Sequence, residues 1–377
     1  MSANANSIRP GDEDRRWLLR SLELAARGGV AVRPNPRVGA VLVKDGRVIG
    51  EGWHARLGGP HAEREALAAC AEDPRGATLY VSLEPCHRHG RTPPCTEAIL
   101  AAGIARVVYA LEDPNPGERG VSHRLLAEAG VAVEGGLLAK EAAAQNPAYV
   151  HRQRTGRPLV TLKSAASLNG LLARADGSSR WITGEAARRE GHRLRARAMG
   201  VAVGGETARL DRPRFDLRLL PDSESAGAAA PRPVVFDGEA LRTPADLGYP
   251  DRQPLLLLPA GVEAPAHSRA GWRVRGVPRG DGGLDLDAAL RELAADEELD
   301  SLLVEGGGRL LSAFLRAGLW ERWELFVAPR LLPADGRPLW TELAARDGLR
   351  VERVRSVGAD LQITLLPPAP AGADEEA

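Results

Sequence analysis

The chain has 377 residues, which is enough for two domains that each bury a core of their own. Its 50 basic and 50 acidic residues balance to a formal net charge of zero, which argues against a general nucleic-acid or membrane-surface binder, because such proteins carry an excess of Lys and Arg. Three cysteines are too few for a disulfide framework, residues 1–20 lack the apolar stretch of a secretory signal, and no uncharged apolar run approaches the roughly 18 residues of a membrane span. We therefore expect a cytoplasmic protein that binds neither nucleic acid nor membrane.

The first half of the chain alternates between predicted strands and helices. Residues 1–10 are expected to form a loose tail, and apolar residues then recur at helical spacing over 12–26. The prolines of Arg33-Pro34-Asn35-Pro36-Arg37 exclude regular structure there. The further predicted elements are strands over 38–43 and 47–52 joined by a tight turn, a helix from 61 to about 72, a strand over 77–83, a helix from 93 to about 102, a strand over 106–111, a helix over 122–129 and a strand over 131–134. Strands that alternate with crossover helices predict a mainly parallel sheet with helices on both faces.

One histidine and two cysteines between Pro60 and Cys95 have the spacing of metal ligands. The imidazole of His61 and the thiolates of Cys86 and Cys95 would hold a zinc ion at three corners of a tetrahedron and leave the fourth corner for water. Glu63, two residues after the histidine, would carry the proton of that water and so act as the catalytic residue. A His-x-Glu triplet by itself occurs by chance in most long chains, but together with Pro-Cys and a second Cys it is typical of zinc-dependent nucleobase deaminases.

Other roles for these residues stay open at this stage. The ligands would form a purely structural zinc site if His87 or His89, which lie close to Cys86, supplied a fourth ligand, since structural sites normally have four protein ligands. Cys70, on the helix that follows His61, is expected to be a small buried hydrophobic residue rather than a ligand.

The pattern changes between Gln145 and Gly156, where a polar bridge over 152–158 precedes a new buried strand. We predict a first domain over 1–147, a second domain over 156–367 and a disordered tail over 368–377. In the second domain Glu305-Gly306-Gly307-Gly308 follows a buried strand and precedes a helix, so that its backbone amides could cradle a pyrophosphate, although structural turn glycines would look identical. The elements predicted there are strands over 159–165, 200–204, 233–236, 255–259 and 301–305, helices over 185–199 and 310–317, and a flexible surface insertion over 221–231.

The first 145 residues resemble the deaminase half of the bifunctional riboflavin-biosynthesis deaminase/reductase family. The motifs that carry the resemblance are Asn35-Pro36-Arg37-Val38-Gly39, Pro60-His61-Ala62-Glu63, Gly90-Arg91-Thr92-Pro93-Pro94-Cys95 and Asp113-Pro114-Asn115-Pro116. Eight residues, 87–94, separate the two cysteines, where most cytidine and tRNA-adenosine deaminases have a much shorter spacing. The family usually has Ser-His where this chain has His87-Arg88, and Val and a second Gly where it has Glu118 and Ser122.

The resemblance implies an N-terminal zinc domain with the three-layer fold of cytidine deaminases. It also implies a small-molecule substrate, 2,5-diamino-6-(5-phosphoribosylamino)pyrimidin-4-one, whose hydrolytic deamination replaces a ring amino group by a carbonyl. Asn35 would then hydrogen-bond the ring, and His54 and Arg91 would bind the arm, Arg91 through its phosphate because a guanidinium matches phosphate geometry. His54 could instead simply cap a turn.

The second half, over about 158–366, resembles the reductase half of the same family, an α/β fold similar to dihydrofolate reductase. The motifs are Lys163-Ser164-Ala165-Ala166-Ser167-Leu168-Asn169-Gly170, Ser179-Arg180-Trp181-Ile182-Thr183, Leu194-Arg195-Ala196, Val203-Gly204-Gly205-Glu206-Thr207 with Asp211 and Pro213, and Glu305-Gly306-Gly307. The resemblance implies reduction of the ribosyl arm to ribityl by hydride transfer from NADPH to the sugar C1. It implies cofactor contacts from Ala165, Trp181, Thr207, Asp211, Gly307 and Gly308. It implies substrate contacts from Ser179, Arg195, Arg218 and Glu305, the arginines being suited to phosphate.

We therefore expect a two-step enzyme of riboflavin biosynthesis, a hydrolase and an oxidoreductase, that uses Zn²⁺ and NADPH and assembles as a homo-oligomer, a dimer or tetramer, as related enzymes do. The family commonly has Asp in place of Asn169 and Asp-Asp-Pro in place of Asp211-Arg212-Pro213, so one alternative is a deaminase with a non-catalytic reductase-like domain. Another zinc nucleobase deaminase is a second alternative, and a third is a zinc-stabilised module that binds nucleic acid or nucleotide. The neutral net charge and Glu63 argue against that module. Trp181 would be a core residue if it had no role in binding.

Overall fold

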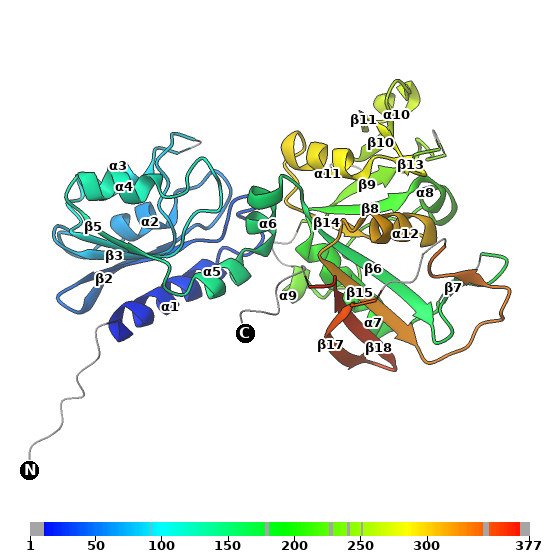
Figure 1. Ribbon diagram of the computed structural model, residues 1–377, viewed down its shortest axis with the longest axis horizontal. Coiled ribbons are helices and arrows are strands. Elements are labelled where there is room, and N and C mark those ends of the chain that lie inside the picture. The colour runs from blue at the N-terminus through cyan, green and yellow to red at the C-terminus, as the bar shows by residue number, and fades with distance from the viewer. Residues whose placement is uncertain are drawn as a thin grey trace, which may run out of the picture. The chain divides into compact units, whose positions relative to one another are not determined.

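The computed structural model (Figure 1) describes residues 11–90, 92–177, 181–225, 229–239, 242–249, 252–341 and 347–369. The chain divides into two compact units, Met1–Gly156 and Arg157–Ala377. The division follows helix α6 (Pro147–Thr155), which ends at Gly156 with a positive φ of 70°. Only Val150 of this helix is buried, so no apolar periodicity marks the helix in the sequence. The polar bridge expected over 152–158 is therefore helical in its first part, up to Thr155. Of the predicted tail, residues 370–377 lie outside the described residues.

The first unit is built on a five-stranded sheet with the order β2-β1-β3-β4-β5. β1 pairs antiparallel with β2 and β3, whereas β3, β4 and β5 are parallel. The expectation of a mainly parallel sheet is therefore only half right, because the tight turn at Asp45-Gly46 can join only antiparallel strands. The strands are β1 (Gly39–Lys44), β2 (Arg47–Trp53), β3 (Thr78–Leu83), β4 (Arg106–Leu111) and β5 (Ala132–Gly135).

Helices cover both faces of this sheet, which gives three layers (Figure 1). Along β1, Val41 and Val43 pack with α1, α5 and α6, whereas Ala40 and Leu42 pack with α2, α3 and α4. This alternation is the two-residue period of a strand that is buried on both faces. The helices are α1 (Asp12–Ala26), α2 (Ala62–Ala68), α3 (Cys95–Ala101), α4 (Val121–Glu128), α5 (Ala139–Gln145) and α6.

Helix α2 ends four residues earlier than the sequence pattern predicted. Its last residue is Ala68 rather than Glu72. The backbone N–H of Ala71 instead donates to the carbonyl of Ile49 on β2, 3.0 Å away, and the chain turns back toward β3. A contact with a distant strand therefore overrides the local helical pattern.

The second unit contains a nine-stranded sheet with the order β11-β10-β9-β8-β14-β6-β15-β18-β17. The strands from β11 to β15 in this order are parallel, and β18 and β17 add an antiparallel edge. The strands of the unit are β6 (Leu159–Ser167), β7 (Leu171–Ala173), β8 (Gly200–Gly204), β9 (Arg232–Phe236), β10 (Leu255–Pro259), β11 (Arg273–Val277), β12 (Arg279–Gly280), β13 (Gly283–Leu284), β14 (Ser301–Val304), β15 (Arg322–Ala328), β16 (Arg337–Pro338), β17 (Arg350–Val357) and β18 (Asp360–Leu366). Its helices are α7 (Glu185–Arg197), α8 (Gly205–Asp211), α9 (Asp222–Ser225), α10 (Pro265–Arg269), α11 (Leu286–Ala295) and α12 (Gly308–Ala317).

Two buried clusters lie on opposite faces of this sheet. One contains Leu162, Val304 and Phe314, and the other contains Val203, Leu303 and Trp272. The central strand β8 runs directly into α8, and β14 is followed by α12 after residues 305–307, so both helices begin at the carboxyl edge of the sheet. In open α/β sheets this edge is where ligands bind. Among the described residues, no helix is both long enough and apolar enough to span a bilayer.

Candidate active sites

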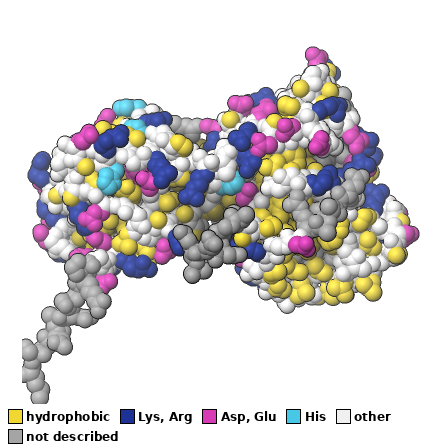
Figure 2. Space-filling view, viewed as in Figure 1, with side chains coloured by type: hydrophobic (Ala, Val, Ile, Leu, Met, Phe, Trp, Pro, Cys, Tyr) yellow, Lys and Arg dark blue, Asp and Glu magenta, His cyan; other side chains and the backbone are white. Residues whose placement is uncertain are grey.

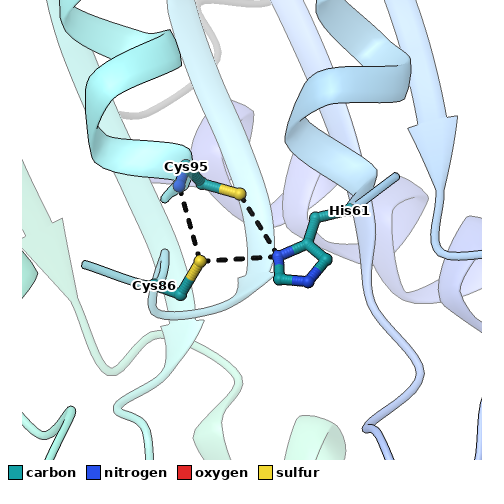
Figure 3. A group of neighbouring side chains, drawn as sticks. All are labelled: His61, Cys86 and Cys95. Carbon is teal, nitrogen blue, oxygen red and sulfur yellow. Dashed lines mark hydrogen bonds between the residues drawn. The ribbon is translucent and has the colours of Figure 1, made fainter. Parts of the chain in front are cut away.

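Three side chains from three separate elements of the first unit converge on one point. His61 is the N-cap of α2, Cys86 follows β3, and Cys95 is the first residue of α3. The Nδ1 atom of His61 lies 3.4 Å from the Sγ atoms of both Cys86 and Cys95, and Figure 3 shows the imidazole turned toward the two thiols. The three ligand atoms all lie within 4.8 Å of one another.

This group has the donor set and spacing that zinc requires. Nitrogen and sulfur ligands at tetrahedral angles, about 2.0 and 2.3 Å from one ion, lie about 3.5 Å apart. Within the described residues, no fourth His, Cys, Asp or Glu belongs to the group. His87 lies against Glu118 and His89 against Glu97, so neither joins it. The residues therefore fit a zinc ion with one open position.

Helix starts and buried neighbours set the charge around these ligands. The backbone N–H of Cys95 donates to Cys86 Sγ over 3.4 Å at the N-terminus of α3. Hydrogen bonding from Cys95, opposed by burial and reinforced by His61, lowers the pKa of the Cys86 thiol to about 4. Glu63 sits in the first turn of α2 and is only 3% exposed, and this burial raises the pKa of its carboxyl. A carboxyl group that can hold a proton therefore lies next to the metal ligands.

Thr92 was not singled out by the sequence analysis, although it belongs to the Gly90-to-Cys95 motif. Its Oγ1 lies 3.2 Å from Nε2 of His61. Because Nδ1 faces the two sulfur atoms, Nε2 carries the hydrogen and donates it to the hydroxyl. Such a partner fixes the orientation of a ligating imidazole.

One of the predicted substrate residues, His54, lies beside His61, and a second, Asn35, contacts His54. The rings of His54 and His61 meet edge to face with centroids 5.4 Å apart. His54 is 3% exposed, and its Nε2 lies 3.2 Å from the side-chain nitrogen of Asn35. The third predicted residue, Arg91, lies outside the described residues.

A buried glutamate that the sequence analysis missed fixes the end of β3. Glu84 is 3% exposed and accepts hydrogen bonds from the backbone of Asp113 and Gly120 and from Ser122 Oγ, at 3.1, 3.0 and 2.8 Å. It thereby ties the Asp-Pro-Asn-Pro loop to the strand end that precedes Cys86. The Ser122 that departs from the family's pattern supplies one of these bonds.

The other departures from the family's pattern contact one another. Glu118 Oε2 lies 2.7 Å from Nδ1 of His87, and Glu118 Oε1 lies 3.4 Å from Nε of Arg88. Arg88 also donates to the carbonyl of Gly117 over 2.6 Å. An acidic residue has therefore replaced an apolar one at the position that faces two basic residues.

A large cleft opens at the carboxyl edge of the second unit's sheet, with a volume of about 1540 Å³. All six predicted cofactor residues line it: Ala165, Trp181, Thr207, Asp211, Gly307 and Gly308. Trp181 is 57% exposed with the Arg188 guanidinium 4.5 Å from its ring, so the alternative that it is a core residue is wrong. The N-terminus of α12, where Gly307 is the N-cap, also lines the cleft.

Packing is tight at two glycines of this helix start. A Cβ on Gly306 would lie 2.9 Å from Cβ of Leu310, and one on Gly308 would lie 3.1 Å from the carbonyl oxygens of Pro338 and Leu339. The N-cap Gly307 makes no side-chain hydrogen bond to the first amides of α12, which leaves them bare of a cap. A helix N-terminus of this kind favours a phosphate group.

The predicted substrate residues of the second unit divide into two groups. Glu305 lines the cleft, and its carboxylate receives two parallel hydrogen bonds of 2.7 Å from Arg195. Burial by itself would raise the pKa of Glu305, but Arg195 and then Lys163 outweigh it and lower that pKa to about 2. Arg218 pairs with Asp216 at 2.5 Å, and Ser179 lies outside the described residues.

Lys163 is a cleft residue to which the sequence analysis gave no role. It lines the cleft on β6 beside Glu305, and burial lowers the pKa of its ammonium group. Lys163 lies between the buried residues Leu162 and Ser164 of this strand. A charged residue inside a buried strand was the sequence signal that could have identified it.

Neither departure from the family's reductase pattern reaches the cleft. Asn169 donates to the carbonyl of Leu332 over 2.8 Å and accepts from its N–H over 3.1 Å, a reciprocal pair that only an amide can make. Arg212 ends α8 and pairs with Asp246 at 2.7 Å. Both residues hold loops in place outside the lining of the cleft.

Known proteins match both halves of the chain. Residues 12–111 match the cytidine and deoxycytidylate deaminase zinc-binding region, and residues 158–363 match the RibD C-terminal domain. The chain is 37% identical over 374 residues to the riboflavin biosynthesis protein RibD of Escherichia coli, an alignment that covers 94% of this chain and 99% of that protein. The chain belongs to the RibD family. The RibD of Aquifex aeolicus is 36% identical over 359 residues, which cover 93% of this chain and 97% of that protein.

Solved RibD structures share the fold of the whole chain. The structure of Acinetobacter baumannii RibD matches with a TM-score of 0.85 and 34% identity and covers 95% of this chain and 99% of that one. A deaminase/reductase from Thermotoga maritima matches with a TM-score of 0.77 and 31% identity over 94% of this chain and 99% of that one. Membership of the RibD family confirms the predicted fold class, a cytidine-deaminase-like domain followed by a dihydrofolate-reductase-like α/β domain. It also confirms a bifunctional hydrolase and oxidoreductase of riboflavin biosynthesis with Zn²⁺ and NADPH as cofactors.

Proposed function

We propose that the first unit deaminates a phosphoribosylamino-pyrimidine and that the second unit reduces the sugar arm of the deaminated product. The observation that carries the proposal is the convergence of His61, Cys86 and Cys95 beside the buried carboxyl of Glu63. The Thermotoga maritima relative is described as a diaminohydroxyphosphoribosylaminopyrimidine deaminase and 5-amino-6-(5-phosphoribosylamino)uracil reductase. We extend that substrate class to this chain and assign the two steps to residues 1–156 and 157–377.

In the deaminase step the side chains bind, orient and move protons. His61, Cys86 and Cys95 would hold a zinc ion, which would lower the pKa of a bound water and so make hydroxide available to attack the ring carbon bearing the amino group. Glu63 accepts the proton of that water and delivers it to the departing amino group, so that water and amine become carbonyl and ammonia. Asn35 binds the ring. Arg91 is kept as the partner of the substrate phosphate by resemblance alone.

For the reductase step we propose that the cleft of the second unit holds both the sugar and the cofactor. NADPH supplies the hydride that the sugar C1 receives. The bare amides at the start of α12 suit the cofactor's pyrophosphate, and the exposed face of Trp181 borders the same cleft. Lys163 and Glu305 offer a donor and an acceptor to the hydroxyl groups of the sugar. Arg218 is proposed for the phosphate, because it contacts Asp216 through one nitrogen and its side chain is 48% exposed, whereas Arg195 directs two nitrogens at Glu305 and is 15% exposed.

The test follows both products in one cuvette. The full-length zinc enzyme is given the aminopyrimidine and NADPH, and ammonia release is followed by loss of NADPH absorbance. Glu63→Gln is expected to slow ammonia release by about a hundredfold or more while zinc stays bound. Glu65→Gln, on the same helical turn, is the matched control and should release ammonia at the normal rate.

Two results would change the assignment. Unchanged turnover of Glu63→Gln would remove its role as proton carrier. Ammonia release without any NADPH consumption would identify a deaminase whose second unit only binds or assembles.

We further propose a homo-oligomer, formed through the edge of the second unit's sheet. Among the described strands β17 pairs only with β18, and Val351, Val354 and Leu361 on these two strands are 61%, 55% and 42% exposed. Figure 2 shows hydrophobic side chains over the lower part of this unit, where Figure 1 draws β17 and β18. Such an edge favours pairing with a second copy. Sedimentation equilibrium tests this, and Val354→Lys is expected to yield monomers.

We place the enzyme in the cytoplasm. Reducing conditions there keep Cys86 and Cys95 as thiols that bind metal rather than as a disulfide.

A further inference from the structure

The ring of His54 is held by protein atoms on both of its nitrogens. Nδ1 lies 2.9 Å from the carbonyl oxygen of Pro60, and Nε2 lies 3.2 Å from the side-chain nitrogen of Asn35. The ring is 3% exposed and packs edge to face on His61. The sequence analysis predicted that His54 binds the substrate arm. Both ring nitrogens of His54 already contact protein atoms, so neither is left for the arm.

Only one arrangement of hydrogens satisfies these contacts. A carbonyl oxygen can only accept, so Nδ1 of His54 carries the hydrogen. The side-chain nitrogen of Asn35 carries two hydrogens and can only donate, so the Nε2 atom that it faces is the acceptor. The amide NH₂ of Asn35 therefore points toward His54, and its Oδ1 points away.

We propose that His54 is a positioning residue that fixes the Asn35 amide with its oxygen free to accept a hydrogen bond from an N–H of the aminopyrimidine. The selectivity follows from chemistry, because an oxygen in that place recognises a donor and rejects a ring that presents a carbonyl there. His54 also holds the carbonyl of Pro60, the residue directly before the metal ligand His61. The proposal deepens the proposed deaminase function and rests on it for the identity of the substrate.

The hydrogen positions are tested on the resting enzyme without substrate. Full-length zinc-loaded protein is labelled with ¹⁵N at its eight histidines, and the His54 signals are assigned by their loss in His54→Gln. The expected spectrum has a protonated, pyrrole-type Nδ1 and an unprotonated, pyridine-type Nε2 for His54. The reverse pattern, or two protonated nitrogens at pH 7.5, would overturn the proposal.

Kinetics then test whether His54 acts through Asn35. Gln can also donate to the Pro60 carbonyl and accept from Asn35, so His54→Gln is expected to keep KM within about threefold, whereas His54→Leu raises KM about tenfold, as for one lost hydrogen bond. In an Asn35→Ala background, replacing His54 by Leu should add less than about twofold to KM. Equal effects of Leu and Gln, or full additivity with Asn35→Ala, would contradict the positioning role.

His267→Gln is the matched control for these variants. His267 is also a buried imidazole, 5% exposed, with a carbonyl partner at 2.9 Å and an edge-to-face aromatic neighbour, but it belongs to the second unit. Its replacement should leave the KM of deamination unchanged. Zinc content is measured for every variant. If His54→Leu does not fold, the KM of Asn35→Ala and the ¹⁵N spectrum still test whether His54 positions Asn35. The spectrum also separates a failure of this proposal from a failure of the deaminase assignment, since it needs no turnover.

Discussion

Arg195 and Glu305 face each other through two parallel hydrogen bonds, Nε to Oε1 and Nη2 to Oε2, each 2.7 Å long. Their side chains are 15% and 10% exposed, so the pair is largely withdrawn from water. Removing one partner of a buried ion pair destabilises a protein by much more than the intact pair stabilises it, because the remaining charge stays buried without compensation.

Glu305→Gln is therefore expected to lower the free energy of unfolding by about 3–5 kcal/mol, measured by urea denaturation at pH 7.5. Tryptophan fluorescence reports on the second unit, which contains Trp181, Trp272, Trp320, Trp323 and Trp340. Glu224→Gln is the control, since Glu224 on α9 pairs at the surface with Arg193, which lies on the same helix as Arg195, and its replacement should leave the midpoint unchanged. Equal shifts for the two variants would show that the bidentate pair has no special weight.

Thr92 is expected to strengthen zinc binding through His61. Thr92→Val removes the hydroxyl that accepts from His61 Nε2 at 3.2 Å and should weaken zinc affinity about tenfold to a hundredfold. Competition with a chelating dye measures this directly and requires no activity. Thr92→Ser keeps the hydroxyl and should bind zinc as tightly as the unmodified protein. Equal zinc affinity for the Val and Ser variants would show that the contact does not hold the ligand.

Arg88 and Glu118 are expected to be energetically coupled. Arg88 is 59% exposed, so the coupling from a double-mutant cycle with Arg88→Gln and Glu118→Gln should be small, about 0.5 kcal/mol. Raising the salt concentration should reduce it further. A coupling of zero would mean that the two departures from the family's pattern arose independently.

Glu321 should make the stability of the second unit depend on pH. Burial raises the pKa of this carboxyl to about 7, while the N–H of Val160 donates to it over 2.7 Å. The folded state therefore holds the proton more tightly than the unfolded chain, so that the stabilising contribution is complete below about pH 4.5 and is lost as the pH rises through about 7.

Glu321→Gln keeps an acceptor for Val160 and is neutral at every pH. The variant should come within about 1 kcal/mol of the unmodified protein near pH 5 and exceed its free energy of unfolding by about 3 kcal/mol at pH 8. Urea denaturation at both pH values measures this. A difference between the two proteins that stays constant with pH would exclude Glu321 as the titrating group.

The metal chemistry could be predicted because it depends on residue type and local position. One histidine and two cysteines at suitable spacing, with Glu63 on the first turn after His61 and prolines before Cys95, indicate both the ligands and the helix starts that carry them. The buried strands β1, β3 and β14 could be predicted for the same reason, since their apolar residues are consecutive in sequence. Helix α6 and the edge strand β17 were missed because they bury little and carry no apolar period.

The partners of the polar side chains were decided only by the tertiary structure. Thr92 meets His61, Glu118 meets His87, and Arg195 meets Glu305, at sequence separations of 31, 31 and 110. Nothing local to either residue specifies such a contact, because it exists only when strands and helices from different parts of the chain bring two backbones together. The sequence by itself therefore determined which chemical groups are available, whereas the folded backbone determined which hydrogen each group carries and toward what it points.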